Sequence, residues 1–214
     1  MASDRELVVI CIHGLWMSGM EMGLLRRRLQ KNLCVPAVQF SYHSVTEGIA
    51  ENARRLSHFI DRFPADSVHL VGHSLGGVLA LQMLKRFPTE KVDRVVCLGS
   101  PLVDSSAARQ LSRRFAGRSI IGKTFFEAVL EQPLRRCDPS HDAGMITGRL
   151  ALGLGRLVAT LEEPNDGVVA QRETELPGLN DHLGVPVSHF GLLLAPSVAR
   201  QIAHFLRYGS FERL

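Results

Sequence analysis

The sequence predicts a single α/β domain, built on a minimal, mostly parallel sheet with helices on both faces. Continuous apolar runs rich in β-branched residues alternate with segments of helical periodicity, which is typical of strands buried between two helical layers. The chain of 214 residues has 45% hydrophobic and 21% charged residues, an ordinary composition for one globular domain. No internal repeat interrupts this alternation.

The first half of the chain contains three apolar strands, each followed by a helix. The predicted strands are 7–12, 37–42 and the apolar run that begins at Val68, and the predicted helices are 21–31, 46–63 and 75–87. The helix at 46–63 is amphipathic, since apolar residues recur in it at intervals of three and four positions. Thr46 is expected to be its N-cap.

In the second half, a strand at 93–101 precedes a long segment without strand character. This segment, 102–140, contains two helical stretches, 105–115 and 123–130. It is expected to form a small helical cap or lid over the site, although a surface excursion with no gating role fits the sequence as well. Core character returns at 145–148 and 150–161, and Pro196 begins a closing amphipathic helix.

The motif Gly72-His73-Ser74-Leu75-Gly76-Gly77 joins the third strand to its helix. A G-x-S-x-G sequence between a strand and a helix is typical of a nucleophile elbow, in which a strained turn exposes the serine hydroxyl. The alternative is a glycine-rich turn with an ordinary N-cap serine. We interpret Ser74 as a nucleophile because the strand, the helix and the double glycine are all present.

Two backbone amides are candidates for an oxyanion hole. The Leu75 N–H lies at the start of the helix that follows Ser74, where helical amides have no intrahelical partner. The first strand ends in His13-Gly14-Leu15, the position where hydrolases with this elbow build their second donor, and we assign that donor to the Leu15 N–H. His13 is then a loop histidine that holds the turn.

A general base and an acid are expected downstream of Ser74. Asp166 lies in an Asn-Asp-Gly turn, and His189 lies between a late strand and the closing helix, which gives the chain order serine, aspartate, histidine. The turn around Asp166 has a purely structural alternative, because Asn-Asp-Gly also favours β-turns. Asp142 and Asp104 are the reserve candidates for the acid, and His182 competes with His189.

These motifs together resemble those of the lipase-like α/β-hydrolases, particularly small bacterial lipases and the related GPI inositol-deacylase-like group. The matching segments are His13-Gly14, Gly72–Gly77, Asn165–Val169 and Ser188–Leu193. The resemblance implies an α/β-hydrolase fold with a Ser-His-Asp triad. The smallest such lipases lack a cap, whereas this chain has room for one at 102–140.

The expected activity is hydrolysis of a carboxylic ester through an acyl-enzyme, with no metal or organic cofactor. Apolar side chains beside the motifs suggest a small-molecule or lipid ester with an apolar acyl group; they are Trp16, Met17, Leu102, Val103 and Phe190. An acyl thioesterase or acyltransferase would use the same triad. A non-catalytic binding protein of the same fold is a further alternative.

Composition and charge limit the partners and the cellular location that we expect. The net charge of +4 comes without a recognised nucleic-acid-binding motif, so nucleic acid is not an expected partner. The basic residues near 109–118 would favour an anionic substrate or peripheral contact with an anionic membrane surface. The four cysteines show neither C-x-x-C spacing nor the spacing of a metal site. No stretch reaches the length of a membrane span, so the expected location is the cytoplasm. The sequence leaves the oligomeric state open.

Overall fold

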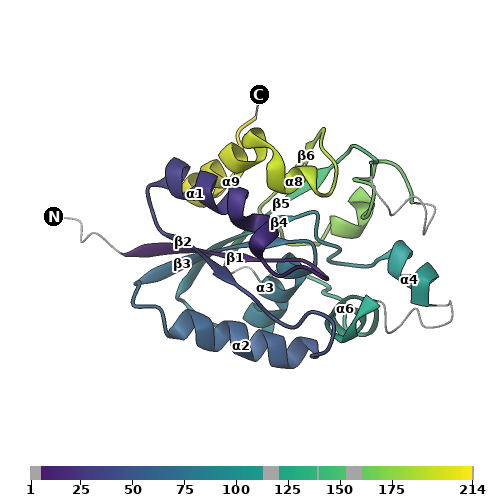
Figure 1. Cartoon of the computed structure of the whole chain (residues 1–214), viewed down its shortest axis with the longest axis horizontal. Coiled ribbons are helices and arrows are strands. Elements are labelled where there is room, and N and C mark those ends of the chain that lie inside the picture. The colour runs from purple at the N-terminus through teal and green to yellow at the C-terminus, as the bar shows by residue number, and fades with distance from the viewer. Residues whose placement is uncertain (1–5, 113–120, 139, 153–160, 214) are drawn as a thin grey trace.

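The computed structural model describes residues 6–112, 121–138, 140–152 and 161–213, and contains a six-stranded parallel sheet (Figure 1). The strand order is β2-β1-β3-β4-β5-β6, and every neighbouring pair is parallel. The strands are β1 (Leu7–Ile12), β2 (Ala37–Phe40), β3 (Ser67–His73), β4 (Val92–Leu98), β5 (Asp142–Gly148) and β6 (Asp181–Val185). The α/β class and the parallel sheet predicted from the sequence are confirmed.

Helices cover both faces of the sheet (Figure 1). One layer consists of α1 (Gly23–Leu33), α8 (Gly191–Leu194) and α9 (Pro196–Tyr208), and the other of α2 (Ile49–Asp61) and α3 (Leu75–Arg86). The short α6 (Lys123–Phe125) and the π-helical turn η2 (Phe126–Glu131) pack on α2 and α3. Shorter elements are η1 (Met20–Met22), α4 (Ser106–Ser112) and η3 (Gln171–Thr174).

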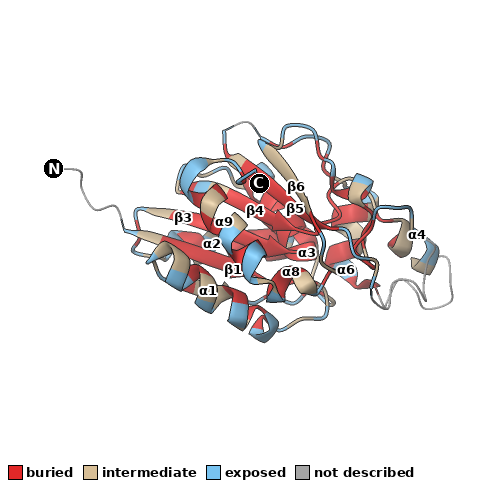
Figure 2. Cartoon of the chain, turned by 90° about the horizontal axis from the view of Figure 1, so that it is seen from above, coloured by how far each residue is buried: buried red, intermediate tan, exposed pale blue. Residues whose placement is uncertain are grey.

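The alternation of side chains along β1 explains why its sequence is a continuous apolar run. Val8, Ile10 and Ile12 belong to the core on the α2/α3 side, whereas Val9 and Cys11 belong to the core on the α1/α9 side. Both sets are buried, as the colours of the central strands in Figure 2 show. A strand covered on both faces has no polar position, so the sequence loses the usual alternation.

The N-terminus of α2 corrects one prediction. The helix begins at Ile49 with Gly48 as N-cap, not at Thr46, and Gly48 offers no side-chain cap. Instead, Glu127 Oε2 of η2 accepts a hydrogen bond of 2.9 Å from the Ile49 N–H. A glutamate far along the chain therefore satisfies the free helical amide, which makes a local capping side chain unnecessary.

The segment predicted as a cap contributes to the core over the part that the structure describes. Buried apolar side chains between residues 121 and 137 join the α2/α3 cluster; they are Ile121, Phe125, Ala128, Val129, Leu134 and Cys137. Residues 113–120, and with them part of the predicted helix 105–115, lie outside the described residues. A lid function for 102–140 stays a prediction.

The stretch 150–161 corrects a second prediction. Leu150 and Leu152 are exposed instead of buried, and residues 153–160 lie outside the described part. The two leucines follow the carboxyl end of β5, and the described residues leave them open to solvent. None of the helices in the described residues is both long and apolar enough to cross a bilayer.

Candidate active site

The turn between β3 and α3 holds Ser74 in a strained conformation. Ser74 has φ 52° and ψ −121°, a region that side-chain-bearing residues rarely adopt. A Cβ atom on Gly72 would lie 2.4 Å from the Gly77 nitrogen, and one on Gly76 would lie 2.2 Å from the Ile12 carbonyl oxygen. Both positions therefore require glycine, because α3 passes too close to β3 at Gly72 and to the end of β1 at Gly76 for a side chain to fit.

This close packing gives a stability prediction. Gly76→Ala is expected to lower the free energy of unfolding by about 3 kcal/mol, since the new methyl group meets rigid backbone. Gly23→Ala, at the start of α1, meets no atom within 4 Å and is expected to raise it by about 0.5 kcal/mol. Urea denaturation of both variants measures the difference. Equal stability of the two would contradict the crowding argument.

Asp166 and His189 form a buried pair. Asp166 Oδ2 lies 2.7 Å from His189 Nδ1, and Asp166 Oδ1 accepts hydrogen bonds from the backbone N–H groups of Val168 (2.9 Å) and Val169 (2.7 Å). The Asp166 carbonyl also accepts from the His189 N–H at 2.9 Å. Both carboxylate oxygens are thus occupied, and the imidazole is held with Nδ1 toward Asp166 and Nε2 away from it.

The elbow and this pair meet at the carboxyl edge of the sheet. Gly99, directly after β4, lies beneath the pair: a Cβ there would be 2.9 Å from Asp166 Oδ2 and 3.1 Å from His189 Nδ1. The Ser74 N–H donates to the Leu98 carbonyl at 2.8 Å. The ring centroids of His73 and His189 are 4.6 Å apart. The Ser74 hydroxyl makes no hydrogen bond with the described residues, and such bonds are often long in unliganded sites.

His73, within the elbow, contacts His189 through its ring and through a hydrogen bond to the main chain. Its Nε2–H donates to the His189 carbonyl at 3.2 Å, so the proton resides on Nε2. Its Nδ1 atom is buried and has no hydrogen-bond partner among the residues that the structure describes. Burial lowers the pKa of His73 well below its usual value, which keeps the ring neutral.

His13 holds the turn after β1, as the sequence suggested. Its Nε2 accepts from the Tyr42 N–H at 3.2 Å, so the proton resides on Nδ1, which donates to the Gly14 carbonyl at 2.8 Å. Burial lowers the pKa of His13, so this ring is neutral too. Tyr42 stacks on the ring at 4.5 Å and donates its hydroxyl to the His13 carbonyl. Sequence reasoning missed this role of Tyr42, since the residue reads as the end of a strand.

The loop that carries Leu15 is fixed on both sides. The Gly14 N–H donates to Met17 Sδ at 3.3 Å, and the Trp16 N–H donates to Ser44 Oγ at 3.2 Å. Among the described residues, none accepts a hydrogen bond from the Leu15 N–H between them. Leu75 is the first residue of α3, so its N–H also has no intrahelical acceptor. Both amides expected to bind an oxyanion are therefore available.

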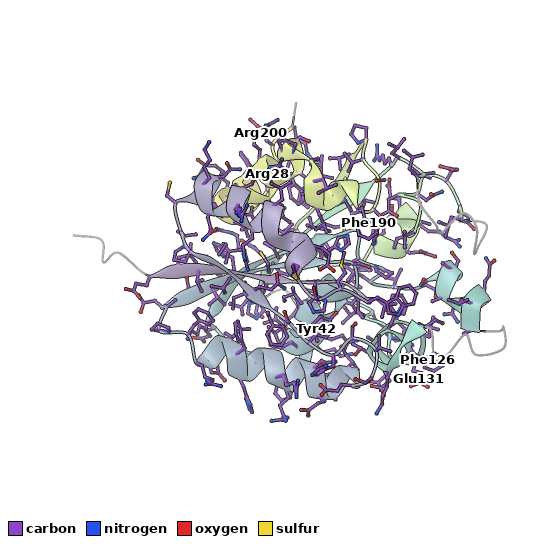
Figure 3. All side chains as sticks on the ribbon, viewed as in Figure 1. Arg28, Tyr42, Phe126, Glu131, Phe190 and Arg200 are labelled. Atoms are coloured by element: carbon purple, nitrogen blue, oxygen red, sulfur yellow. The ribbon has the colours of Figure 1, made fainter. Side chains whose placement is uncertain are left out.

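The apolar residues expected to bind substrate divide into two groups. Trp16 and Phe190 are exposed, at 62% and 58%, and Met17 is half-buried (Figure 3 labels Phe190). Leu102 is instead fully buried in the α2/α3 core, and Val103 packs against that core. Leu102 therefore presents no surface to a substrate, because its side chain is packed within this core.

The reserve candidates have other partners. His182 Nε2 on β6 bonds with the hydroxyls of Thr147 and Thr174, at 2.9 and 3.0 Å. Asp142 begins β5, at the opposite end of that strand from the site, and pairs with an arginine. Asp104 likewise pairs with an arginine. Within the described residues, no cluster of three or more histidine, cysteine or acidic side chains is placed to bind a metal ion.

Comparison with known proteins identifies the family to which this chain belongs. Residues 9–187 match the model of the alpha/beta hydrolase family, so the chain belongs to that family. This confirms the resemblance inferred from the motifs. A comparison with curated proteins gave no significant match.

Solved structures of lipases and esterases share the fold. The mature lipase BlEst2 of Bacillus licheniformis has a TM-score of 0.73 at 18% identity, over 96% of this chain and 93% of that one. The metagenomic carboxyl esterase MGS0156 has a TM-score of 0.69 at 14% identity, over 97% and 76%. The RedJ thioesterase of the prodiginine pathway in Streptomyces coelicolor has a TM-score of 0.60 at 16% identity, over 94% and 85%. The chain is therefore a hydrolase by family and lipase-like by fold.

Proposed function

We propose that the protein is a serine esterase that cleaves carboxylic esters through Ser74, His189 and Asp166. The observation that carries the proposal is the buried Asp166–His189 pair, joined at 2.7 Å beside the strained turn that presents Ser74. In this arrangement, Asp166 fixes the tautomer of His189, and the free Nε2 atom is the acceptor for the serine proton.

The reaction proceeds in two halves. Ser74 Oγ forms a bond to the ester carbonyl carbon while His189 Nε2 takes its proton, and the carbonyl π-electrons move onto oxygen. The Leu15 and Leu75 N–H groups bind this oxyanion, each contributing about 3 kcal/mol by analogy with measured oxyanion donors. Collapse breaks the bond to the leaving alkoxide, which takes the proton from His189. Water then attacks the acyl-enzyme in the same way: His189 takes its proton, and collapse releases the carboxylic acid and returns the proton to Ser74.

The substrate proposed is an ester with an apolar acyl group. Trp16 and Phe190 flank the site with large exposed apolar surfaces, which would otherwise be unfavourable in water. Phe190 directly follows His189, and its ring centroid lies 6.4 Å from the imidazole. An acyl chain that contacts Phe190 would therefore lie beside the proposed base.

The test begins with a fluorophosphonate probe, which reacts with activated serines. We expect labelling of the tryptic peptide that contains Ser74, detected by mass spectrometry, and none in Ser74→Ala. Initial rates on p-nitrophenyl esters from acetyl to dodecanoyl are expected to rise with chain length. Absence of labelling would favour a non-catalytic protein. Faster cleavage of acyl-CoA than of the matched oxygen ester would identify a thioesterase instead.

A further inference from the structure

The layer formed by α1, α8 and α9 has an unbalanced positive charge. Its three helices contain no acidic residue and six basic ones, more than the net charge of +4 on the whole chain. The six are Arg26, Arg27, Arg28, Lys31, Arg200 and Arg207. Figure 2 looks down onto this layer, and Figure 3 labels Arg28 and Arg200 on its two neighbouring long helices. We call this surface the α1–α9 face.

These charges are not neutralised by neighbours. Within the described residues, no carboxylate forms an ion pair with any of the six. Two of them donate instead to backbone carbonyls: Arg28 to Leu194 and Arg207 to Asn32. On α2, in the opposite layer, Arg54 and Arg55 both pair with Glu51. Ion pairs within the described residues therefore do not offset the positive charge of the α1–α9 face.

Exposed apolar side chains adjoin the basic residues at the site end of this face. Met20 is 86% exposed, Leu24 42% and Leu194 55%, and Phe190 continues the group toward His189. Leu24 lies one helical turn from Met20 and one turn from Arg28, and Arg28 bonds to the Leu194 carbonyl. The apolar group and the basic residues thus form one continuous surface.

We propose that the α1–α9 face docks on an anionic phospholipid membrane. Lipid headgroups supply the negative charge that the arginines lack in the protein, and the adjacent acyl region accepts the apolar side chains. A second copy of the chain does not fit, because two faces of the same charge repel. The phosphates of a nucleic acid would neutralise the arginines, but they would leave the apolar side chains exposed to water. Docking would also place the site entrance, at Phe190, against the bilayer.

The test is co-sedimentation of the protein with vesicles. Binding to phosphatidylcholine vesicles containing phosphatidylserine is compared with binding to phosphatidylcholine alone. The variant Arg27→Gln/Arg200→Gln is expected to lower the partition coefficient for anionic vesicles about 25-fold, since each basic residue near such a surface contributes about fivefold. Leu24→Gln is expected to weaken binding as well. The matched control, Arg62→Gln/Lys85→Gln, removes the same charge from exposed positions on the opposite side of the sheet and should leave binding within about twofold.

The measurement does not depend on catalysis, so the Ser74→Ala variant is expected to bind vesicles as the original chain does. A failure of the docking proposal is therefore distinguishable from a failure of the esterase proposal. Equal partition onto both vesicle types, or equal loss in the matched control, would overturn the proposal. Binding of an oligonucleotide to the protein that anionic vesicles fail to displace would also overturn the proposal.

Discussion

Ser74→Ala is expected to lower kcat/KM for p-nitrophenyl ester hydrolysis by roughly a million-fold, the scale seen when a serine hydrolase loses its nucleophile. The hydroxyl makes no hydrogen bond with the described residues, so its removal breaks no structural contact. The free energy of unfolding should therefore stay within about 0.5 kcal/mol of the original value. Steady-state kinetics and urea denaturation measure the two effects separately.

Ser197→Ala, on the exposed side of α9, is the control for serine loss as such. It is expected to retain full activity and stability. A Ser74→Ala protein with substantial ester hydrolysis, purified free of other esterases, would show that another group attacks the substrate.

Asp166→Asn is expected to lower kcat by about ten-thousand-fold with little change in KM, as in serine proteases altered at the corresponding acid. The reason is the direction in which the new amide must point. Two backbone N–H groups donate to Asp166 Oδ1, so the amide oxygen of asparagine must stay there and its NH₂ group must face His189 Nδ1. The histidine then carries its proton on Nε2 and cannot accept one from Ser74.

Two other carboxylates serve as controls for this change. Asp142→Asn and Asp104→Asn each remove a charge that pairs with an arginine, and neither carboxylate contacts His189. Both are expected to leave kcat unchanged, with circular dichroism confirming the fold of all three variants. Loss of activity in either control, with Asp166→Asn still active, would reassign the acid.

The features predicted correctly from the sequence are those that local patterns determine. The strands read as apolar runs because both faces of the sheet are covered, and α9 begins at Pro196 because proline fits the first turn of a helix. The glycines around Ser74 indicate close packing at the elbow, and the close approach of α3 to β3 and to the end of β1 requires them. The catalytic roles of Ser74, Asp166 and His189 stay predictions until the variants are measured.

The features that escaped prediction depend on contacts between distant segments. Glu127 caps α2 across a long sequence separation, so Thr46 looked like the better cap. Tyr42 and Ser44 support the loop between β1 and α1, which no spacing in the sequence reveals. Leu102 looked available to substrate because the direction of its side chain is set by the tertiary fold, which buries it.

The neighbouring imidazoles also limit where a proton can travel. His13 and His73 are neutral and each has one ring proton committed to a carbonyl, on Nδ1 in His13 and on Nε2 in His73. The ring lone pair of His13 accepts a hydrogen bond from Tyr42, and that of His73 is buried among the described residues. In the proposed mechanism, three clustered rings therefore behave as a single base. A proton that leaves Ser74 can therefore pass only to His189, and from His189 it can pass only to the leaving group.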